Sequence, residues 1–161
     1  AALKKARDHN MQTVLDLASY NVVEANIDFL KEIVGQYIDI IFANEDEASA
    51  FTGKKDPLEA LHHLADVAKI AIVKTGEKGS FVQKDNNVHQ IGVIKAKSID
   101  TTGAGDLYAA GFLYGYIQGF SLEKCGAIGA LLAGNVIENL GAKIQPSRWD
   151  EIQREITRIQ Q

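Results

Sequence analysis

Short apolar runs separated by helical patterns constrain the fold of this chain most. Ile70 to Val73 holds four apolar residues in succession, without the polar alternation of a half-exposed strand. Ile38 to Ala43 and Thr13 to Ala18 are two further strand candidates upstream. Uninterrupted runs of this kind are typical of parallel strands that helices cover on both faces. The alternation therefore predicts an α/β fold, with ligands bound at the carboxyl ends of the strands.

Local signals predict where the intervening helices begin and end. Val22 to Val34 carries apolar residues at helical spacing, and we expect Gly35 to end that helix. Gly53 is expected to end the next one. Asp56 before Pro57 has the order of an N-cap and a first helical residue, so a third helix should begin there.

The pattern changes in the second half of the chain. Gly79 to Gln83 and Val88 to Ile94 flank a turn at residues 85–87, which predicts an antiparallel pair at the edge of the sheet. After Asp100 we expect only helices, at Ala104 to Gln118, Leu122 to Asn139 and Arg148 to Ile159. The chain is thus predicted to form one α/β domain over residues 1–161, with a mostly parallel sheet and helices on both faces.

Composition excludes several classes of function. A net charge of −4 and the lack of a dense Lys/Arg block argue against a nucleic-acid partner. The longest apolar run, Leu107 to Phe120, is too short to span a membrane. Cys125 is the single cysteine, which excludes an internal disulfide and fits a reducing compartment. We therefore expect a cytoplasmic protein.

The strongest candidate site is the run Asp-Thr-Thr-Gly-Ala-Gly-Asp at residues 100–106. Gly103, Ala104 and Gly105 allow a ligand to approach the backbone, and the first amides of the following helix have no helical partners. These amides and the helix dipole would form an anion hole for phosphate. Asp106 could then accept the proton of a hydroxyl that attacks a γ-phosphate. The alternative is that Asp106 is only a favourable acid in the first turn of a helix.

Two common nucleotide motifs do not fit the chain. It has no Gly-x-x-x-x-Gly-Lys-Ser/Thr stretch, so it is not a P-loop protein. A dinucleotide fingerprint that starts at Gly103 would need a small residue where Tyr108 stands. An NAD-binding dehydrogenase is therefore disfavoured.

Three motifs in order resemble those of the ribokinase/PfkB kinases. Residues 100–106, followed by Ala-Ala-Gly-Phe at 109–112, resemble the C-terminal signature of that family. Asn44-Glu45-Asp46-Glu47 resembles its Asn-x-x-Glu motif, and residues 74–79 resemble its Gly-x-x-Gly nucleotide loop. The resemblance implies a three-layer ribokinase-like fold of which this chain is the C-terminal part, with the N-terminal half missing. It also implies ATP and Mg²⁺ as cofactors.

The resemblance assigns roles to individual residues. Asn44 and Glu47 would hold Mg²⁺ through water, although alone they also fit a helix capping box. Lys74, Thr75, Gly76 and Gly79 would flank the nucleotide, although the two glycines also fit an ordinary turn. The family also implies a monovalent-cation site for potassium at Asp100 and Thr102. It places Ala130 on the adenine side of the nucleotide.

The function expected from the resemblance is transfer of the γ-phosphate of ATP to a hydroxyl of a sugar or nucleoside. The run Asp16-Leu17-Ala18-Ser19 is closest to the adenosine-kinase-like branch. The resemblance also implies a homodimer in the full-length protein. Because the N-terminal substrate and lid region is absent, the alternative is a nucleotide-binding fragment or module without turnover.

Overall fold

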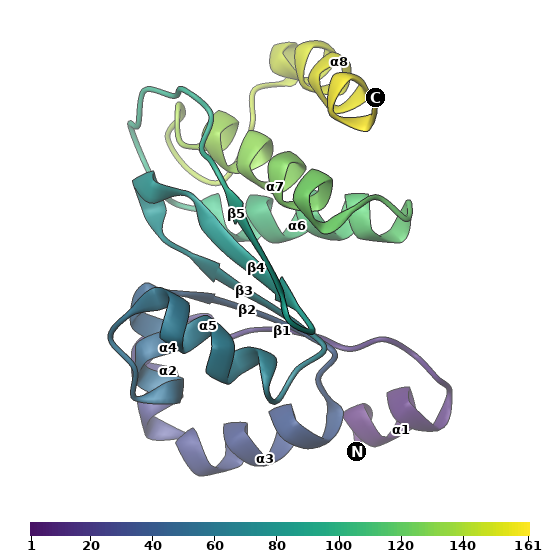
Figure 1. Ribbon diagram of the computed structural model, residues 1–161. Helices are drawn as coiled ribbons and strands as arrows, with labels where there is room; N and C mark the ends of the chain where they lie inside the picture. The colour runs from purple at the N-terminus through teal and green to yellow at the C-terminus, as the bar shows by residue number, and fades with distance from the viewer. The chain divides into compact units, whose positions relative to one another are not determined.

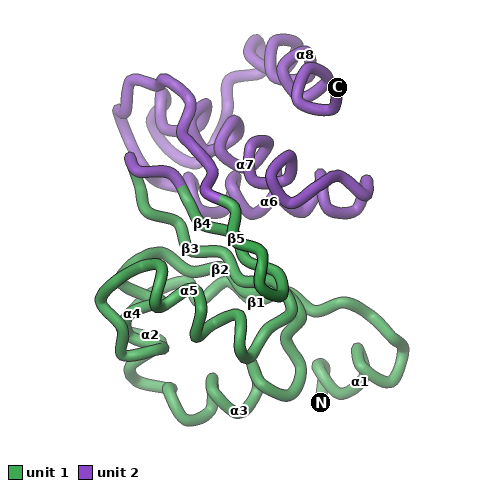
Figure 2. Tube along the Cα trace, in the orientation of Figure 1, with its two compact units in different colours: residues 1–76, 80–89 green, residues 77–79, 90–161 purple.

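The computed structural model describes residues 1–161, and the chain divides into two compact units. The first unit contains residues 1–76 and 80–89, and the second contains residues 77–79 and 90–161 (Figures 1 and 2). The strands lie almost entirely in the first unit and the long C-terminal helices in the second. The single catalytic domain expected over residues 1–161 stays a prediction.

The strands form one five-stranded sheet, in the order β1-β2-β3-β4-β5. β1 pairs with β2 in parallel, β2 pairs with β3 in parallel, and β4 runs antiparallel to β3. This confirms the mostly parallel sheet with an antiparallel edge. The strand bounds are Val14–Asp16, Ile40–Asn44, Ile70–Lys74, Ser80–Lys84 and Asn87–Ile91.

Five helices belong to the first unit, and most pack on one face of its strands. Ile41 and Ala43 of β2 lie in one apolar cluster with Leu61 and Leu64. The intervening residues of β2, Ile40 and Phe42, are fully buried as well, which confirms the strand pattern without alternation. The helices are α1 (Ala2–Asp8), α2 (Tyr20–Ala25), α3 (Ile27–Tyr37), α4 (Glu45–Thr52) and α5 (Pro57–Ala65).

Helix boundaries followed the local signals at two positions and departed from them at a third. Gly53 adopts a left-handed conformation at the end of α4, and the Asp56 carboxylate accepts hydrogen bonds from the first amides of α5. The predicted end at Gly35 is wrong, because α3 continues through Gly35 to Tyr37. The break falls instead at Asn26, between α2 and α3. One exposed glycine costs a helix only about 1 kcal/mol, which the burial of Val34 outweighs.

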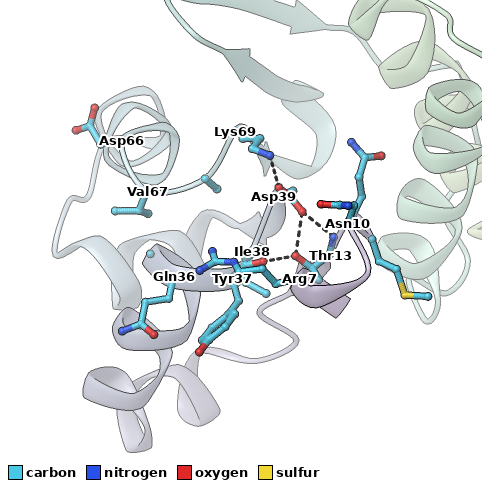
Figure 3. Close-up of a pocket in the computed structure, with 14 residues that line it drawn as sticks. Arg7, Asn10, Thr13, Gln36, Tyr37, Ile38, Asp39, Asp66, Val67 and Lys69 are labelled. Atoms are coloured by element: carbon cyan, nitrogen blue, oxygen red, sulfur yellow. Dashed lines mark hydrogen bonds and ion pairs between the residues drawn. The ribbon is translucent and has the colours of Figure 1, made fainter. Parts of the chain in front are cut away.

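A hydrogen-bonded cluster centred on Asp39 lies in the first unit, at the end of the sheet where the parallel strands begin (Figure 3). The Asp39 carboxylate accepts hydrogen bonds from the Thr13 amide at 2.8 Å and the Thr13 hydroxyl at 3.1 Å, and it pairs with Lys69 at 2.7 Å. Arg7 lies over the Tyr37 ring, 4.8 Å from its centre. These residues line a cavity of about 640 Å³ that contains none of the predicted site residues.

Asp39→Asn is expected to lower the free energy of unfolding at pH 7 by about 1–2 kcal/mol, since charged hydrogen bonds are lost. Burial would raise the pKa of Asp39, but Lys69 and the Thr13 hydrogen bonds together lower it. A lowered folded-state pKa stabilises the protein above the unfolded pKa of about 3.9, and this contribution disappears as the pH falls through the folded-state value. Urea unfolding of both proteins at pH 7 and pH 3 checks this, and a difference that does not shrink in acid would contradict it.

Three helices make up most of the second unit: α6 (Ala104–Ile117), α7 (Leu122–Val136) and α8 (Trp149–Gln160). Glycines allow α6 and α7 to pack closely. A Cβ on Gly111 would lie 2.8 Å from the Ile128 carbonyl oxygen, and one on Gly129 would lie 2.8 Å from the Tyr108 carbonyl oxygen. The small residues at Gly111 and Gly129 are therefore packing positions. Ile152 of α8 is buried in the same cluster as Leu131, Leu132, Val136 and Ile144.

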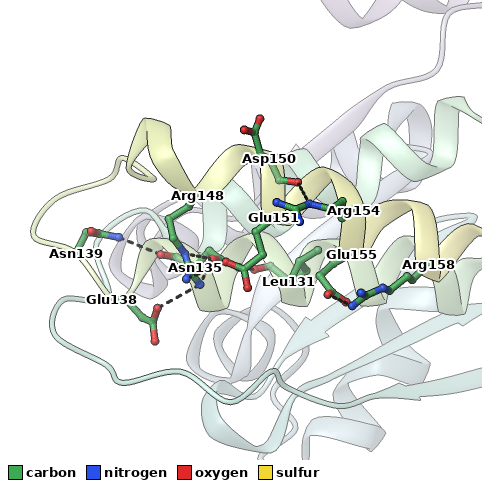
Figure 4. Close-up of polar contacts among 10 residues, drawn as sticks. All are labelled: Leu131, Asn135, Glu138, Asn139, Arg148, Asp150, Glu151, Arg154, Glu155 and Arg158. Atoms are coloured by element: carbon green, nitrogen blue, oxygen red, sulfur yellow. Dashed lines mark hydrogen bonds and ion pairs between the residues drawn. The ribbon is translucent and has the colours of Figure 1, made fainter.

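Arg148 joins the start of α8 to the end of α7 (Figure 4). Its Nη2 and Nε donate to the Asn135 side-chain oxygen at 2.9 and 3.2 Å. Its guanidinium also pairs with Glu151 at 3.1 Å and lies 3.7 Å from Glu138. Asn135 is buried, so Arg148 supplies the partners that its oxygen needs.

Arg148→Met is expected to lower the free energy of unfolding by about 1–3 kcal/mol, because the buried Asn135 oxygen loses its donors. Arg154→Met is a matched control, since Arg154 donates only to a carbonyl of its own helix, that of Asp150. Chemical denaturation measures both variants. Equal effects of the two substitutions would show that the Arg148–Asn135 contact does not hold α8.

Candidate nucleotide site

Polar side chains gather where the three parallel strands of the first unit end. Asp16, Asn44 and Lys74 are the last residues of β1, β2 and β3. Asn44 and Lys74 are register partners across β2 and β3. The carboxyl edge of a parallel sheet is where α/β proteins bind ligands, so the sheet places these residues at the edge expected for a site.

Asn44 and Glu47 form a reciprocal capping box at the start of α4. The Asn44 side-chain oxygen accepts from the Glu47 amide at 2.8 Å, and a Glu47 carboxylate oxygen accepts from the Asn44 amide at 2.8 Å. The other Glu47 oxygen accepts from the Asn44 side-chain nitrogen at 2.8 Å. The capping-box interpretation of this motif is thus confirmed, while its role toward Mg²⁺ stays a prediction.

The donor set at this edge fits magnesium only in part. Glu47 is 4% exposed, and burial raises its pKa, whereas the Asn44 amide and the positive charge of Lys74 act to lower it. No group of three or more His, Cys, Asp or Glu side chains forms a metal cage. Mg²⁺ prefers oxygen ligands and retains several waters when it binds beside phosphates. One carboxylate and one amide therefore suit an ion held through water rather than by the protein alone.

An ion pair at the same edge was not foreseen from the sequence as a site feature. Lys74 Nζ lies 2.9 Å from Asp16 Oδ2, so the lysine expected to flank a nucleotide is paired with a carboxylate. The other Asp16 oxygen accepts from the Ala18 amide at 3.1 Å. The sequence shows an acid at the end of one strand and a lysine at the end of another, but not that the two side chains meet, because β2 lies between β1 and β3.

The loop that precedes α6 is held in shape by Asp100. One Asp100 oxygen accepts from the Thr102 amide at 2.9 Å and the Thr102 hydroxyl at 2.7 Å, and the other accepts from the Gly141 amide at 2.8 Å. These hydrogen bonds, that from Gly141 first, lower the pKa of Asp100. Asp100 thus joins two loops that are 41 residues apart in sequence.

Gly103 lies against the second of these loops. It has a φ of 80°, and a Cβ at this position would lie 2.5 Å from the Cβ of Ala142 and 2.9 Å from its Cα. Neither the conformation nor the space admits another residue. Glycine is therefore required at position 103 by backbone conformation and packing, whatever ligand the loop binds.

Backbone amides at the amino end of α6 can donate hydrogen bonds to an anion. No side chain caps this helix, in contrast to α4 and α5. The Ala104 amide donates to the Thr101 carbonyl at 3.1 Å, whereas the amides of Gly105 and Asp106 have no partner in the structure. Asp106 is exposed in the first turn. Of the predicted anion-hole amides, that of Ala104 is therefore already engaged.

The remaining predicted nucleotide contacts lie on the turn after β3 and on α7. Gly76 and Gly79 both have positive φ, 57° and 95°, and a Cβ on Gly79 would lie 2.0 Å from the Ile91 carbonyl oxygen. The turn interpretation of these glycines is thus supported, and their nucleotide role stays a prediction. Thr75 is buried, and Ala130 is half-buried on α7.

Comparison with known proteins identifies relatives that are kinases. The family model described as pfkB family carbohydrate kinase matches residues 1–149. A curated nucleoside kinase of Methanocaldococcus jannaschii is 35% identical over an alignment of 153 residues, and the match covers 92% of this chain and 48% of that protein. A cytidine kinase of Thermococcus kodakarensis is 37% identical over an alignment of 118 residues, and the match covers 71% of this chain and 42% of that protein.

Solved structures agree with this result. The adenosine kinase from Sinorhizobium meliloti superposes with a TM-score of 0.89 at 36% identity, covering 96% of this chain and 48% of that one. No helix of the structure combines the length and the apolar character needed to cross a membrane. The chain spans about half the length of the relatives it matches. The order of motifs, the sheet and these relatives together show that the chain belongs to the pfkB carbohydrate kinase family.

Proposed function

We propose that this chain carries the ATP-binding and phosphoryl-transfer residues of a kinase that acts on a hydroxyl of a nucleoside or sugar. The observation that carries the proposal is the start of α6, where two unpartnered amides and an exposed Asp106 follow the tightly packed Gly103. Amides at a helix start attract phosphate oxygens, and a carboxylate beside them has no use as an anion ligand. It suits the removal of a proton from an attacking hydroxyl.

In this proposal Asp106 is the general base. It takes the proton of the acceptor hydroxyl as the hydroxyl oxygen attacks the γ-phosphorus, while the amides of Gly105 and Asp106 stabilise the charge on the transferred group. Asp100 keeps these amides in place through its bonds to Thr102 and Gly141. A potassium ion beside Asp100 and Thr102 would have to share the Asp100 oxygens, which already accept hydrogen bonds from Thr102 and Gly141.

In the first unit, Asn44 and Glu47 would hold Mg²⁺ through water. Bound magnesium would neutralise charge on the β- and γ-phosphates of ATP. Thr75 and Gly76 would flank the nucleotide, as would Gly79, and Ala130 would lie on its adenine side. The capping box supports this assignment, since it fixes both oxygen-bearing side chains before any ligand arrives.

For the acceptor we propose a nucleoside ahead of a sugar. The relatives named above are a nucleoside kinase, a cytidine kinase and an adenosine kinase. A probable sugar kinase from Rhizobium etli is just as similar in structure, with a TM-score of 0.89 at 35% identity. Sugars therefore form the second acceptor class.

The test is transfer of labelled γ-phosphate from ATP with Mg²⁺ to separate pools of nucleosides and sugars. Labelled nucleoside monophosphate is the expected product, and label in the sugar pool would correct the acceptor class. A protein that neither transfers phosphate nor binds ATP in a calorimetric titration would contradict the proposal.

A second candidate function is nucleotide binding without turnover. It is favoured by one observation: the chain spans about half the length of its relatives. Calorimetry together with the transfer assay separates the two candidates. Binding of ATP with Mg²⁺ and no labelled acceptor of either class would favour the binding module.

A further inference from the structure

The ion pair between Asp16 and Lys74 has no role in the function proposed above. Lys74 is the last residue of β3 and Asp16 the last residue of β1, and the two side chains meet at the carboxyl edge of the sheet. Glu47 lies close enough for both charges to act on it. The cluster thus holds two carboxylates and one ammonium, with a net charge of about −1.

The position of Lys74 differs from that of a lysine that waits for a phosphate. Its side chain is 16% exposed, whereas the side chain of Lys69, just before the same strand, is 75% exposed. A long cationic side chain normally keeps its charged end in water when no partner holds it. Lys74 instead lies 2.9 Å from Asp16.

Asp16 is itself fixed by the backbone. Its second oxygen accepts from the Ala18 amide at 3.1 Å, in a turn where Ala18 has a φ of 63° and the Ser19 amide donates to the Leu17 carbonyl at 2.7 Å. A positive φ is strained for alanine and persists only where the surroundings enforce it. These contacts fix the position of the Asp16 carboxylate, and the carboxylate in turn fixes the position of the Lys74 ammonium.

The charges of Asp16 and Lys74 determine how this pair affects nucleotide binding. A polyphosphate that approaches Asn44 and Glu47 would meet a second carboxylate, that of Asp16. Removing one partner of a shielded ion pair leaves an uncompensated charge, which is more harmful than removing both. With Lys74 in place, Asp16 is neutralised and only the charge of Glu47 remains for the magnesium ion to balance.

We infer that Lys74 is the counter-ion of Asp16 rather than a ligand of the phosphates. By neutralising Asp16, it reduces the negative charge beside Asn44 and Glu47, so that ATP is not repelled there. This inference rests on the proposed function, since it requires that ATP binds at Asn44 and Glu47. It replaces the expectation that Lys74 contacts the nucleotide. The two roles of Lys74 predict opposite behaviour when Asp16 is also removed.

The experiment is a calorimetric titration of ATP with Mg²⁺ against four proteins: wild type, Lys74→Met, Asp16→Asn and the double variant. We expect Lys74→Met to raise the Kd about tenfold, because Asp16 is then unpaired. The double variant is expected to regain most of that affinity, to within about threefold of wild type. A double variant as weak as Lys74→Met would overturn the inference, because the lysine would then act on the phosphates directly.

Asp16→Asn alone tests the inference even if Lys74→Met does not fold. This variant frees the ammonium charge, so ATP should bind about threefold more tightly, and weaker binding would overturn the inference. Lys69→Met is the matched control, since it breaks an ion pair of 2.7 Å with Asp39 where the strands begin, and it should leave the Kd unchanged. Wild-type protein that does not bind ATP would reject the proposed function itself, whereas binding that ignores the Asp16 and Lys74 substitutions would reject only this inference.

Discussion

Asp106→Asn is expected to slow phosphoryl transfer by about 10²–10⁴-fold while ATP and Mg²⁺ still bind. The amide keeps the shape of the carboxylate but cannot take a proton, and general-base catalysis contributes a factor of this size. Because Asp106 is exposed and its side chain accepts no capping bond, the fold should tolerate the change. Single-turnover transfer from labelled ATP to the accepted nucleoside measures the rate.

Asp150→Asn is the matched control for this variant. Asp150 is also an exposed acid in the first turn of a helix, α8, and it has no proposed role in catalysis. Its replacement should leave the transfer rate unchanged. Transfer by Asp106→Asn within about threefold of wild type would remove Asp106 from the mechanism and leave it as a favourable first-turn acid.

Gly111→Ala is expected to lower the free energy of unfolding by about 1–3 kcal/mol or more. The new Cβ would lie 2.8 Å from the Ile128 carbonyl oxygen and 2.9 Å from the Gly129 Cα. These are backbone atoms of α7, so no side-chain rotation relieves the overlap. α6 and α7 would have to move apart, although alanine is by itself the better helix former.

Gly35→Ala provides the control on helix propensity. Gly35 lies inside α3, and a Cβ there would meet nothing within 4 Å. This substitution should therefore stabilise the protein by up to about 1 kcal/mol. Thermal unfolding of both variants checks the pair of predictions. A Gly111→Ala variant that is as stable as wild type, or more stable, would show that α6 and α7 do not pack as described.

Features set by neighbouring residues could be predicted from the sequence. Asp56 before Pro57 begins α5, Gly53 ends α4, and the motif at Asn44 and Glu47 forms a capping box. The same local reasoning failed at Gly35, because the burial of Val34 and Leu30 outweighs the low helix propensity of one exposed glycine.

Features that join distant parts of the chain could not be predicted with the same detail. Asp100 bonds to Gly141, and Asp16 pairs with Lys74 across 58 residues. The residue types at these positions were visible, but their partners depend on strand order and loop path. For this reason Gly103 was foreseen as a small residue, whereas its contact with Ala142 was not.

Amide chemical shifts report directly whether the start of α6 receives the phosphates of ATP. In two-dimensional ¹⁵N NMR spectra of this chain, ATP with Mg²⁺ should shift the amides of Gly105 and Asp106 most strongly within α6. The Ala104 amide, already bonded to Thr101, should move less. Saturating ATP that leaves Gly105 and Asp106 unshifted, while residues elsewhere respond, would show that the phosphates do not bind at the start of α6.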